Sequence, residues 1–490
     1  MHPIYRAAEI RQIEHNFIAV NPGISLMERA GLAAAEKARD MLGDGFRALV
    51  VCGPGNNGGD GLVVARYLHQ WGYQVTTVLL GDASKLPSDA AAAYKQFVNA
   101  GRTATSDIPK ERQWDLIVDG LFGIGLARAA EGKLAETIEW VNATNCSVLA
   151  LDIPSGLNSD TGNIFGVAIR ATETITFIGL KPGLLTADGK DHAGHVSIAS
   201  LNIDQQQLTK PSGHLLEQAV VAKYLPRRKL NSHKGSFGSL GIIGGADGML
   251  GAVALASRAA LKLGTGRVYL GTLTKLPNGY DPVQPELMWR EAETLFTYDH
   301  LTALVIGPGM GQSEVAKNLL VRAIESPLPL LLDADALNLI SVNKSLQETL
   351  RARFHPTLLT PHPTEAARLL NCDTTTIQKD RVEAALKLAK QFNSAVVLKG
   401  AGSICALPDG NWFINPTGNP GMASAGTGDV LSGLIGALLA QGLEAAQALL
   451  LGVYLHGAAA DSLLAQNIGP IGMTASEIID EARRLSNVWN

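Results

Sequence analysis

The chain has 490 residues, of which 46% are hydrophobic and 18% are charged. This composition supplies enough apolar side chains for large cores and excludes a disordered chain, and the length favours two or more domains. The formal net charge of −4, without a long basic run, gives no electrostatic case for nucleic acid or an anionic membrane surface as a partner.

Cysteine usage and the N-terminal segment bear on the compartment. The four cysteines are scattered and form no CxxC pair, which predicts no disulfide framework and favours a reducing cytoplasm. The first residues, MHPIYRAAEIRQIEH, carry charges where a signal peptide needs an apolar core. No apolar run approaches the roughly 18 residues that a membrane span requires. We therefore expect a soluble, cytoplasmic protein with no membrane partner.

The first part of the chain alternates between apolar runs typical of strands and helical patterns. Continuous apolar strands joined by helices indicate a mostly parallel sheet covered on both faces, an α/β, Rossmann-like three-layer αβα domain. The expected strands are 47–52, 74–80, 114–120, 146–154 and 173–179, and the expected helices are 24–41, 60–71, 88–100 and 132–143.

The alternation lapses in the polar segment 202–218, which contains Pro211 and Gly213, and then restarts. We predict two α/β domains, 1–208 and 219–490, joined by a linker over 209–218. The second domain has expected strands at 239–245, 303–309, 328–335, 356–363 and 394–400, and a hairpin over 403–416 that turns at Pro408-Asp409-Gly410.

The segment GPGNNGGDG lies between the first strand and the following helix. Its Gly53, Gly55 and Gly58 satisfy G-x-G-x-x-G, and the next strand ends at Asp82, where a dinucleotide-binding fold places a ribose ligand. The pattern therefore leaves open a nicotinamide-dependent dehydrogenase, and also a glycine-rich turn that binds nothing.

The same segment carries more polar groups than a pyrophosphate loop needs. Asn56, Asn57 and Asp60 add side-chain oxygens, although Asp60 could also be a helix N-cap. Two further strands end in acidic residues, Asp119 and Asp152, and Ser155 follows the second of them. Because ligands sit outside the carboxyl ends of the strands in such sheets, we expect Asn57, Asp119 and Ser155 in one crevice. Such an all-oxygen set is of the kind that a hard cation prefers.

The first part of the chain contains the motifs GPGNNGGDG, VDGLFGIGL, LDIPSGLNSDTG and TFIGLKPGLLT. Through these motifs, most of residues 5–205 resemble the NAD(P)H-hydrate epimerase family. The resemblance implies a potassium ion at Asn57, Asp119 and Ser155, and proton transfer by Asp152 during epimerisation. Lys181 is a second proton-transfer candidate, with a solvated surface lysine as the alternative. The implied substrate-binding residues are Asn56, Asn57, Gly58, Gly59, Asp60, Gly123, Ile124, Gly125, Leu126, Ala127, Arg128, Ala129 and Asp152.

The C-terminal segment SAGTGDVLSGLIGALLAQG is typical of a phosphate cradle. Backbone N–H groups of Gly426, Thr427 and Gly428 can point at a phosphate, and the helix that follows adds its positive N-terminal end. The helix should be anchored in the core by one apolar face. Asp429 in its first turn is either a cap or a base that deprotonates a hydroxyl beside this anion hole.

Other strand ends of the second domain carry polar residues. Lys399 follows a strand and precedes the small residues Gly400, Ala401, Gly402 and Ser403, which let a nucleotide approach the backbone. His362 lies in a polar turn after another strand, where a surface position is the simplest alternative to a functional one.

The second part of the chain contains the motifs SHKGSFG, IGPGMG, DADALN, TPHPTEA, VLKGAGS and NPGMASAGTGDVLSG. Through these motifs, residues 220–488 resemble the ribokinase-like superfamily and, more closely, the ADP-dependent NAD(P)H-hydrate dehydratases. The resemblance implies a nucleotide at Lys399–Ser403 and Gly428, and the hydrate near Ala252, Gly309, His362 and Asp429. Glu365 and Asp333 are weaker candidates for holding Mg²⁺, while Asp335 could equally be structural.

Together the two halves resemble the bifunctional NAD(P)H-hydrate repair enzymes. This resemblance implies epimerisation of NADHX and NADPHX by the first domain and dehydration of the S form by the second, with ADP as co-substrate. A vitamin-precursor kinase fused to a dinucleotide-binding module, a dehydrogenase, and a first domain that only binds the dinucleotide are the alternatives. We also expect a homo-oligomer, as is common for α/β domains of this size.

Overall fold

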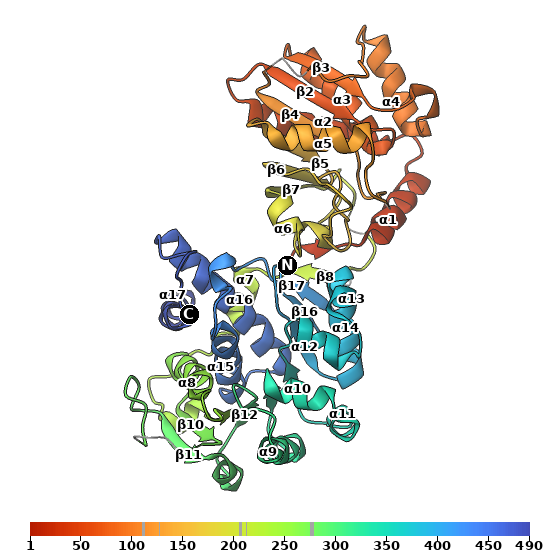
Figure 1. Cartoon of the computed structure of the whole chain (residues 1–490). Helices are drawn as coiled ribbons and strands as arrows, with labels where there is room; N and C mark the ends of the chain where they lie inside the picture. The colour runs from red at the N-terminus through yellow and green to blue at the C-terminus, as the bar shows by residue number, and fades with distance from the viewer. Residues whose placement is uncertain (110–112, 127, 205–207, 212, 275–278) are drawn as a thin grey trace. The chain divides into compact units, whose positions relative to one another are not determined.

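The computed structural model describes residues 1–490 except 110–112, 127, 205–207, 212 and 275–278 (Figure 1). The chain divides into two compact units, His2–Gly213 and Met1 together with His214–Asn490. The division falls inside the segment 209–218, and the finer domain limits of 1–208 and 219–490 stay a prediction.

The N-terminal unit contains a parallel sheet with the strand order β3-β2-β4-β5-β6-β7. The strands of this unit are β1 (Pro3–Ile4), β2 (Arg47–Cys52), β3 (Gln74–Leu79), β4 (Leu116–Gly120), β5 (Ser147–Leu151), β6 (Glu173–Phe177) and β7 (His195–Ala199), of which β2 to β7 form the sheet. Its helices are α1 (Ala7–Val20), α2 (Leu26–Leu42), α3 (Asn56–Gln70), α4 (Ser88–Asn99), α5 (Lys133–Ala143) and α6 (Gly189–His192), with the short 3-10 helices η1 (Ala83–Lys85) and η2 (Pro182–Leu184).

Alternate residues of β2 enter two separate cores. Ala48 and Val50 pack with α1 to α4, whereas Leu49 and Val51 pack with α5. Since successive side chains of a strand point to opposite faces, the sheet is covered on both sides, as Figure 1 shows for the helices around β2 and β4. The predicted three-layer αβα fold is thereby confirmed.

Helix α3 begins earlier than predicted. The pattern placed the helix start near residue 60, but the helix includes Asn56 and has Gly55 as its N-cap. Tight packing explains the glycines: a Cβ on Gly53 would lie 1.9 Å from the Leu121 carbonyl oxygen, and one on Gly58 would lie 1.9 Å from the Gly53 carbonyl oxygen. Asp60 therefore lies in the second turn, and its interpretation as an N-cap is wrong.

The C-terminal unit is built on a sheet in which the strands β8 to β17 have the spatial order β8-β17-β16-β15-β14-β13-β12-β9-β10-β11. The strands from β15 to β11 in this order pair in parallel, whereas β15, β16 and β17 pair antiparallel, which confirms the predicted hairpin. The strands are β8 (Gly213–Leu215), β9 (Ser239–Gly244), β10 (Arg267–Thr272), β11 (Met288–Glu291), β12 (Ala303–Ile306), β13 (Leu330–Leu332), β14 (Thr357–Leu359), β15 (Ala395–Leu398), β16 (Ile404–Ala406) and β17 (Trp412–Ile414).

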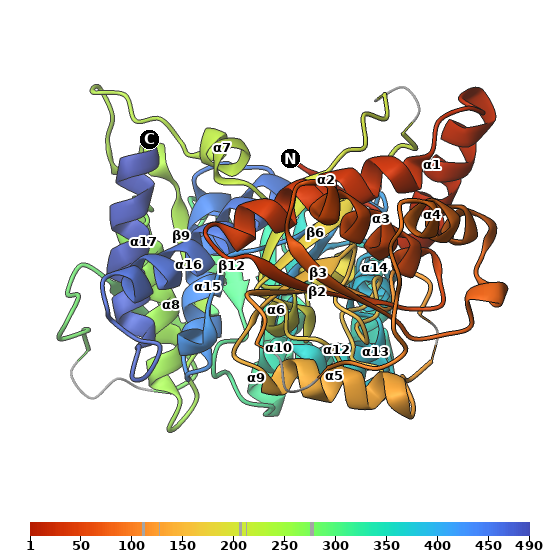
Figure 2. The same ribbon diagram turned by 90° about the horizontal axis from the view of Figure 1, so that it is seen from above.

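Helices lie on both faces of this sheet, with α8 and α15 to α17 on one side and α10 and α12 to α14 on the other (Figure 2). They are α7 (Gln218–Val221), α8 (Leu250–Lys262), α9 (Glu314–Glu325), α10 (Asp335–Ser341), α11 (Lys344–Arg351), α12 (Pro363–Leu369), α13 (Thr374–Lys379), α14 (Arg381–Phe392), α15 (Thr427–Ala440), α16 (Ala445–Ala465) and α17 (Ala475–Trp489), with 3-10 helices η4 (Ala222–Tyr224), η5 (Lys234–Phe237), η6 (Ala292–Thr297) and η7 (Pro420–Met422).

Helix α15 occupies the centre of one helical layer. Every residue from Val430 to Ala440 is buried, so the predicted anchoring of the helix in the core is confirmed and extends beyond one apolar face. The helix is surrounded because it packs against both α8 and α16. Gly433 permits the approach to α8, since a Cβ there would lie 2.0 Å from the carbonyl oxygen of Ala256. The phosphate cradle predicted at the start of α15 is thus held on a rigid element.

Helix α16 contradicts the expectation that no apolar run approaches the length of a membrane span. Its 21 residues are long and apolar enough to cross a membrane by length and composition alone. Two thirds of its most apolar window, 67%, is buried inside the unit, as in the core helix of a globular domain.

Candidate functional site

Three predicted cation ligands of the N-terminal unit meet around the backbone of Phe122. The Asn57 amide nitrogen donates to the Phe122 carbonyl oxygen at 2.9 Å, and Ser155 Oγ accepts from the Phe122 N–H at 2.8 Å. Ser155 Oγ also donates to Asp119 Oδ1 at 2.6 Å. The three side chains come from the start of α3 and from the ends of β4 and β5, as the strand-end argument predicts.

Asp119 is the single carboxylate of this oxygen cluster. Burial raises its pKa to about 6, although hydrogen bonds from Ser155 and Leu121 favour the ionised form. No group of three or more His, Cys, Asp or Glu side chains that could hold a metal occurs in the described part of the chain. The donors are therefore hydroxyl, amide and carbonyl oxygens around one carboxylate.

Asp152 and Lys181 form a buried ion pair in the same unit. The Lys181 side chain is 0% exposed, so the alternative of a solvated surface lysine is wrong. Asp152 follows β5 with a φ of 65°, a conformation that aspartate adopts more readily than most residues. It is 8% exposed.

Two further carboxyl groups act on this pair. Burial, followed by the charges of Asp152, Glu14 and Asp89, raises the pKa of Asp60 well above its usual value. Burial and the charge of Asp152 also raise the pKa of Glu14, which Lys181 and Arg11 partly oppose. Sequence reasoning missed Glu14 because no helix was expected over residues 7–20.

The segment predicted to line the substrate pocket is partly exposed. Gly123 lies against the Asn57 side chain, since a Cβ there would be 3.3 Å from Asn57 Oδ1. Ile124 packs on the core of α1 to α4, whereas Gly125, Arg128 and Ala129 are exposed. Leu126 donates its N–H to the Gly123 carbonyl oxygen at 3.3 Å, and Ala127 lies outside the described residues.

In the C-terminal unit, the N-terminus of α15 faces a lysine. Gly426 is the N-cap with a φ of 90°, so the interpretation of Asp429 as a cap is wrong. A Cβ on Gly428 would lie 3.5 Å from Lys399 Nζ. An ammonium group therefore adds its charge to the positive end of the helix, where an anion is favoured.

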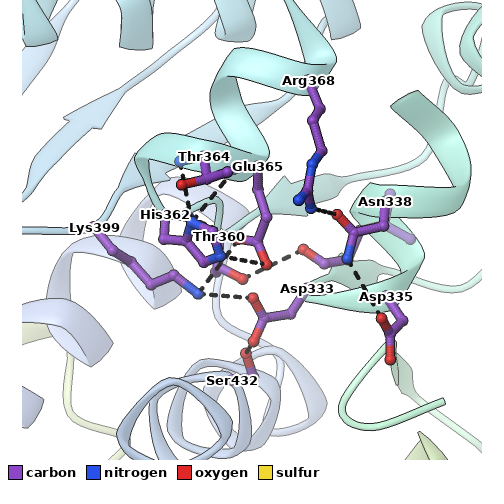
Figure 3. A network of polar contacts seen from close by, with 11 residues as sticks. Asp333, Asp335, Asn338, Thr360, His362, Thr364, Glu365, Arg368, Lys399 and Ser432 are labelled. Carbon is purple, nitrogen blue, oxygen red and sulfur yellow. Dashed lines mark hydrogen bonds and ion pairs between the residues drawn. The ribbon is translucent and has the colours of Figure 1, made fainter. Parts of the chain in front are cut away.

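Lys399 is held by two acidic side chains, as Figure 3 shows. Its Nζ lies 2.9 Å from Asp333 Oδ1 and 3.9 Å from Glu365 Oε2. Ser432, one turn after Asp429 on α15, donates to Asp333 Oδ2 at 2.7 Å. Burial lowers the pKa of Lys399, but the charges of Asp333 and Glu365 outweigh burial and leave it raised.

His362 is the N-cap of α12, and its side chain is about half exposed. Its Nδ1 accepts N–H bonds from Thr364 at 3.1 Å and Glu365 at 3.3 Å. Because Nδ1 is an acceptor, the neutral ring carries its proton on Nε2. Burial and the charge of Lys399 lower its pKa, which keeps the imidazole neutral.

Asp429 has the properties of a base. Burial and the charge of Asp333 raise its pKa to about 6, although Lys399 partly opposes them. A carboxylate that titrates near neutrality can accept a proton at physiological pH. Asp335 instead accepts the Gly311 N–H at 2.9 Å, which supports a structural role.

The remaining predicted residues flank this centre. A Cβ on Gly309 would lie 3.1 Å from the Ala252 side chain, so the loop after β12 touches the first turn of α8 there. Gly400 and Ala401 are exposed, Gly402 is buried, and Ser403 Oγ donates to the Gly400 carbonyl oxygen at 3.0 Å. Sequence reasoning missed Arg381, whose guanidinium donates to the Lys399 carbonyl oxygen at 3.3 Å from behind this loop.

His456 on α16 is a second group that sequence reasoning missed. It is 6% exposed, and its Nε2 has no hydrogen-bond partner among the described residues. Burial, followed by the charge of Lys399, lowers its pKa to about 4, although a backbone bond with Thr427 partly opposes this. The imidazole is therefore neutral beneath the first turn of α15.

This shift predicts an acid-labile C-terminal unit. Between about pH 6.5 and pH 4 the unfolded chain binds a proton at His456 that the folded chain refuses, so stability falls as pH falls. The contribution amounts to about 3 kcal/mol across that window. Between about pH 6.5 and pH 4, the unfolding free energy measured with urea should therefore fall by about 3 kcal/mol less in a His456→Leu variant than in the native chain. The exposed His355→Leu should behave like the native chain. Equal losses in all three proteins would contradict the prediction.

The second unit, with a lysine and an aspartate at a helix N-terminus beyond a parallel sheet, belongs to the ribokinase-like class of α/β enzymes. It is similar to a ribokinase-like superfamily protein from Enterococcus faecalis, with a TM-score of 0.50 and 25% identity over 58% of this chain and 98% of that one. It is also similar to the ADP/ATP-dependent NAD(P)H-hydrate dehydratase from Bacillus subtilis, which was co-crystallised with ATP and Mg²⁺. That comparison gives a TM-score of 0.52 and 32% identity over 56% of this chain and 99% of that one.

Two family models match the chain: NAD(P)H-hydrate dehydratase over residues 240–484 and YjeF-related protein N-terminus over residues 23–183. The bifunctional NAD(P)H-hydrate repair enzyme of Escherichia coli strain K12 is 41% identical over 99% of this chain and 94% of its own length. The chain belongs to the family of bifunctional NAD(P)H-hydrate repair enzymes.

Proposed function

We propose that this protein repairs NADH and NADPH that have been hydrated at C6 of the reduced nicotinamide ring. The N-terminal unit interconverts the R and S epimers, and the C-terminal unit dehydrates the S epimer with ADP, giving NAD(P)H, AMP and phosphate. The observation that carries this proposal is the 41% identity to the E. coli repair enzyme along 99% of the chain, which includes both constellations.

For epimerisation, we assign Asp152 as the base and Asp60 as an acid. Asp152 accepts the C6 hydroxyl proton while the bond between C6 and the ring nitrogen breaks, which leaves an aldehyde and an electron pair on nitrogen. Asp60, whose pKa burial and neighbouring carboxylates raise, supplies the proton to that nitrogen. Closure on the other face reverses both transfers, so that atoms and charge balance.

The oxygen cluster at Asn57, Asp119 and Ser155 fits a potassium ion. Hydroxyl, amide and carbonyl oxygens with one carboxylate suit a hard cation of low charge, and no thiol or imidazole takes part among the residues described above. Potassium held there would supply a fixed positive charge beside the predicted substrate-binding residues at the start of α3.

For dehydration, Asp429 removes the proton of the C6 hydroxyl as its oxygen attacks the terminal phosphorus of ADP. Lys399 and the N-terminus of α15 stabilise the charge of the phosphoryl group in transfer. The C6–O bond then breaks with loss of a proton from the adjacent ring carbon, which restores the double bond and releases phosphate. Hydroxide is a poor leaving group, and phosphorylation removes that obstacle.

The Asp333 site does not favour magnesium directly. Both carboxylate oxygens of Asp333 already accept hydrogen bonds, from Lys399 and from Ser432. We therefore propose that Mg²⁺ enters on the phosphate oxygens of the nucleotide and its own waters, as this ion commonly does.

We place the protein in the cytoplasm, consistent with its free cysteines. We also expect a homo-oligomer, and light scattering of the purified chain will test that expectation.

The test is to mix the purified chain with racemic hydrate, ADP and Mg²⁺ and to follow NADH by absorbance. We expect all of the hydrate to be recovered as NADH. Rapid recovery of half would mean that the N-terminal unit does not epimerise, and no recovery would defeat the proposal. If a phosphorylated compound accumulates instead, the chain is a small-molecule kinase.

A further inference from the structure

Lys181 uses every N–H of its ammonium group inside the protein. The residue precedes η2, and its side chain is 0% exposed. Its Nζ donates to Thr176 Oγ1 at 2.9 Å, to the Phe177 carbonyl oxygen at 2.7 Å and to Asp152 Oδ1. An ammonium has three N–H donors. No proton is left to point at a substrate.

The contacts of Asp152 are confined to one of its oxygens. Oδ1 accepts from Lys181 Nζ, from the Phe177 N–H at 3.2 Å and from Thr176 Oγ1 at 3.3 Å. The Asp152 backbone is fixed as well, since its N–H donates to the Ile175 carbonyl oxygen at 2.8 Å. Among the described residues, Oδ2 takes part in none of these bonds, so it is the oxygen that can exchange a proton.

The surroundings of Asp152 make the cation necessary. Glu14 on α1 and Asp60 on α3 both interact with its charge, and Asp89 in the first turn of α4 adds to the acidic field on both of them. Arg11 acts on Glu14, and Lys181 is the cation in direct contact with Asp152. Without Lys181, Asp152 would be a buried carboxylate among other carboxyl groups with no cation in direct contact, which is a costly arrangement.

We propose that Lys181 is a positioning residue for proton transfer in the N-terminal unit. It orients Asp152 through Oδ1 and supplies its countercharge, while Oδ2 carries the proton to and from the substrate. This inference rests on the proposed epimerase function, and it excludes Lys181 itself as the group that exchanges the proton.

The test compares Lys181→Met with the native full-length chain. Interconversion of the R and S hydrates is followed by chromatography without ADP, so that the dehydratase is idle, and kcat/KM is measured against pH. We expect a loss of about 100-fold near pH 7, a shift of the acidic limb to higher pH and partial recovery in alkaline buffer. The exposed Lys85→Met is the matched control and should keep the native profile.

Two outcomes would overturn the inference. An unchanged profile would show that Asp152 does not need the cation, and loss of the alkaline limb with the acidic limb in place would identify Lys181 as the proton donor. If Lys181→Met does not fold, Thr176→Val removes one acceptor while keeping the charge, and we expect about a 10-fold loss with the limb shifted in the same direction. A native chain that does not epimerise would reject the proposed function, whereas an active native chain with an insensitive Lys181→Met rejects this inference alone.

Discussion

Replacing Asp429 by asparagine should abolish dehydration of the S hydrate while epimerisation continues at the native rate. Asparagine keeps the size of the side chain at the start of α15 but cannot accept the hydroxyl proton. General-base catalysis contributes up to about 10⁴-fold, so we expect a loss of at least about 10³-fold in the ADP-dependent rate. The two activities separate because each belongs to its own compact unit.

The pH dependence of dehydration gives an independent check on the same residue. The pKa of Asp429 is raised to about 6, so the native rate should fall as the pH drops through about 6 and the base takes up a proton. The residual rate of Asp429→Asn should not follow that limb. Exposed Asp480→Asn on α17 serves as the control and should retain both activities and the native profile. Loss of epimerisation in Asp429→Asn would contradict the division of labour.

Strand ends were the part of both sites that sequence reasoning could place. Asn57, Asp119 and Ser155 lie far apart in the chain, yet they converge because the carboxyl ends of parallel strands share one edge. Lys399 follows β15 and reaches the first turn of α15 for the same reason. An apolar strand followed by polar and small residues is a local pattern, so the sequence contains it directly.

Burial and helix starts were less accessible. A run with Gly58 and Gly59 has low helix propensity, yet both lie in the first turns of α3. Glycine is required at position 59 because a Cβ there would lie 2.6 Å from the Met27 sulfur on α2. Close packing between distant segments thus overrides local preference. The burial of Lys181 depends likewise on Asp152, 29 residues away in sequence, and no periodic pattern records that pairing.

His456 and Glu14 show a third limit. Each lies on a helix in a position that periodicity assigns to a face but not to a site. His456 becomes relevant because α16 packs on α15, and Glu14 because α1 faces the Asp152 pair. Such residues are found only when the packing of helices on the sheet is known.

Lys399→Met should remove dehydration and also weaken the C-terminal unit. Methionine fills the space of the lysine stem, but it leaves Asp333 and Glu365 buried without the cation that lies 2.9 and 3.9 Å from them. Breaking a buried pair costs about 3 to 5 kcal/mol, and because Lys399 is 21% exposed we expect the lower end of that range at pH 7. The ADP-dependent rate should fall at least about 10³-fold, because the charge opposite the phosphoryl group is lost.

The stability effect of Lys399→Met has a defined pH signature. The difference in unfolding free energy from the native chain should shrink in acid, since Glu365, whose pKa burial raises, takes up a proton there and no longer needs a cation. The difference should also shrink in strong alkali, because Lys399 of the native chain loses its own proton there. The pKa of Lys399 is raised, so this loss occurs at a higher pH than for an ordinary lysine. Urea unfolding at several pH values measures both limbs, with the exposed Lys387→Met as control. A Lys399→Met protein as stable as the native chain at pH 7 would mean that Asp333 and Glu365 are held by Ser432 and the α12 cap alone, and the lysine would then act on the nucleotide only.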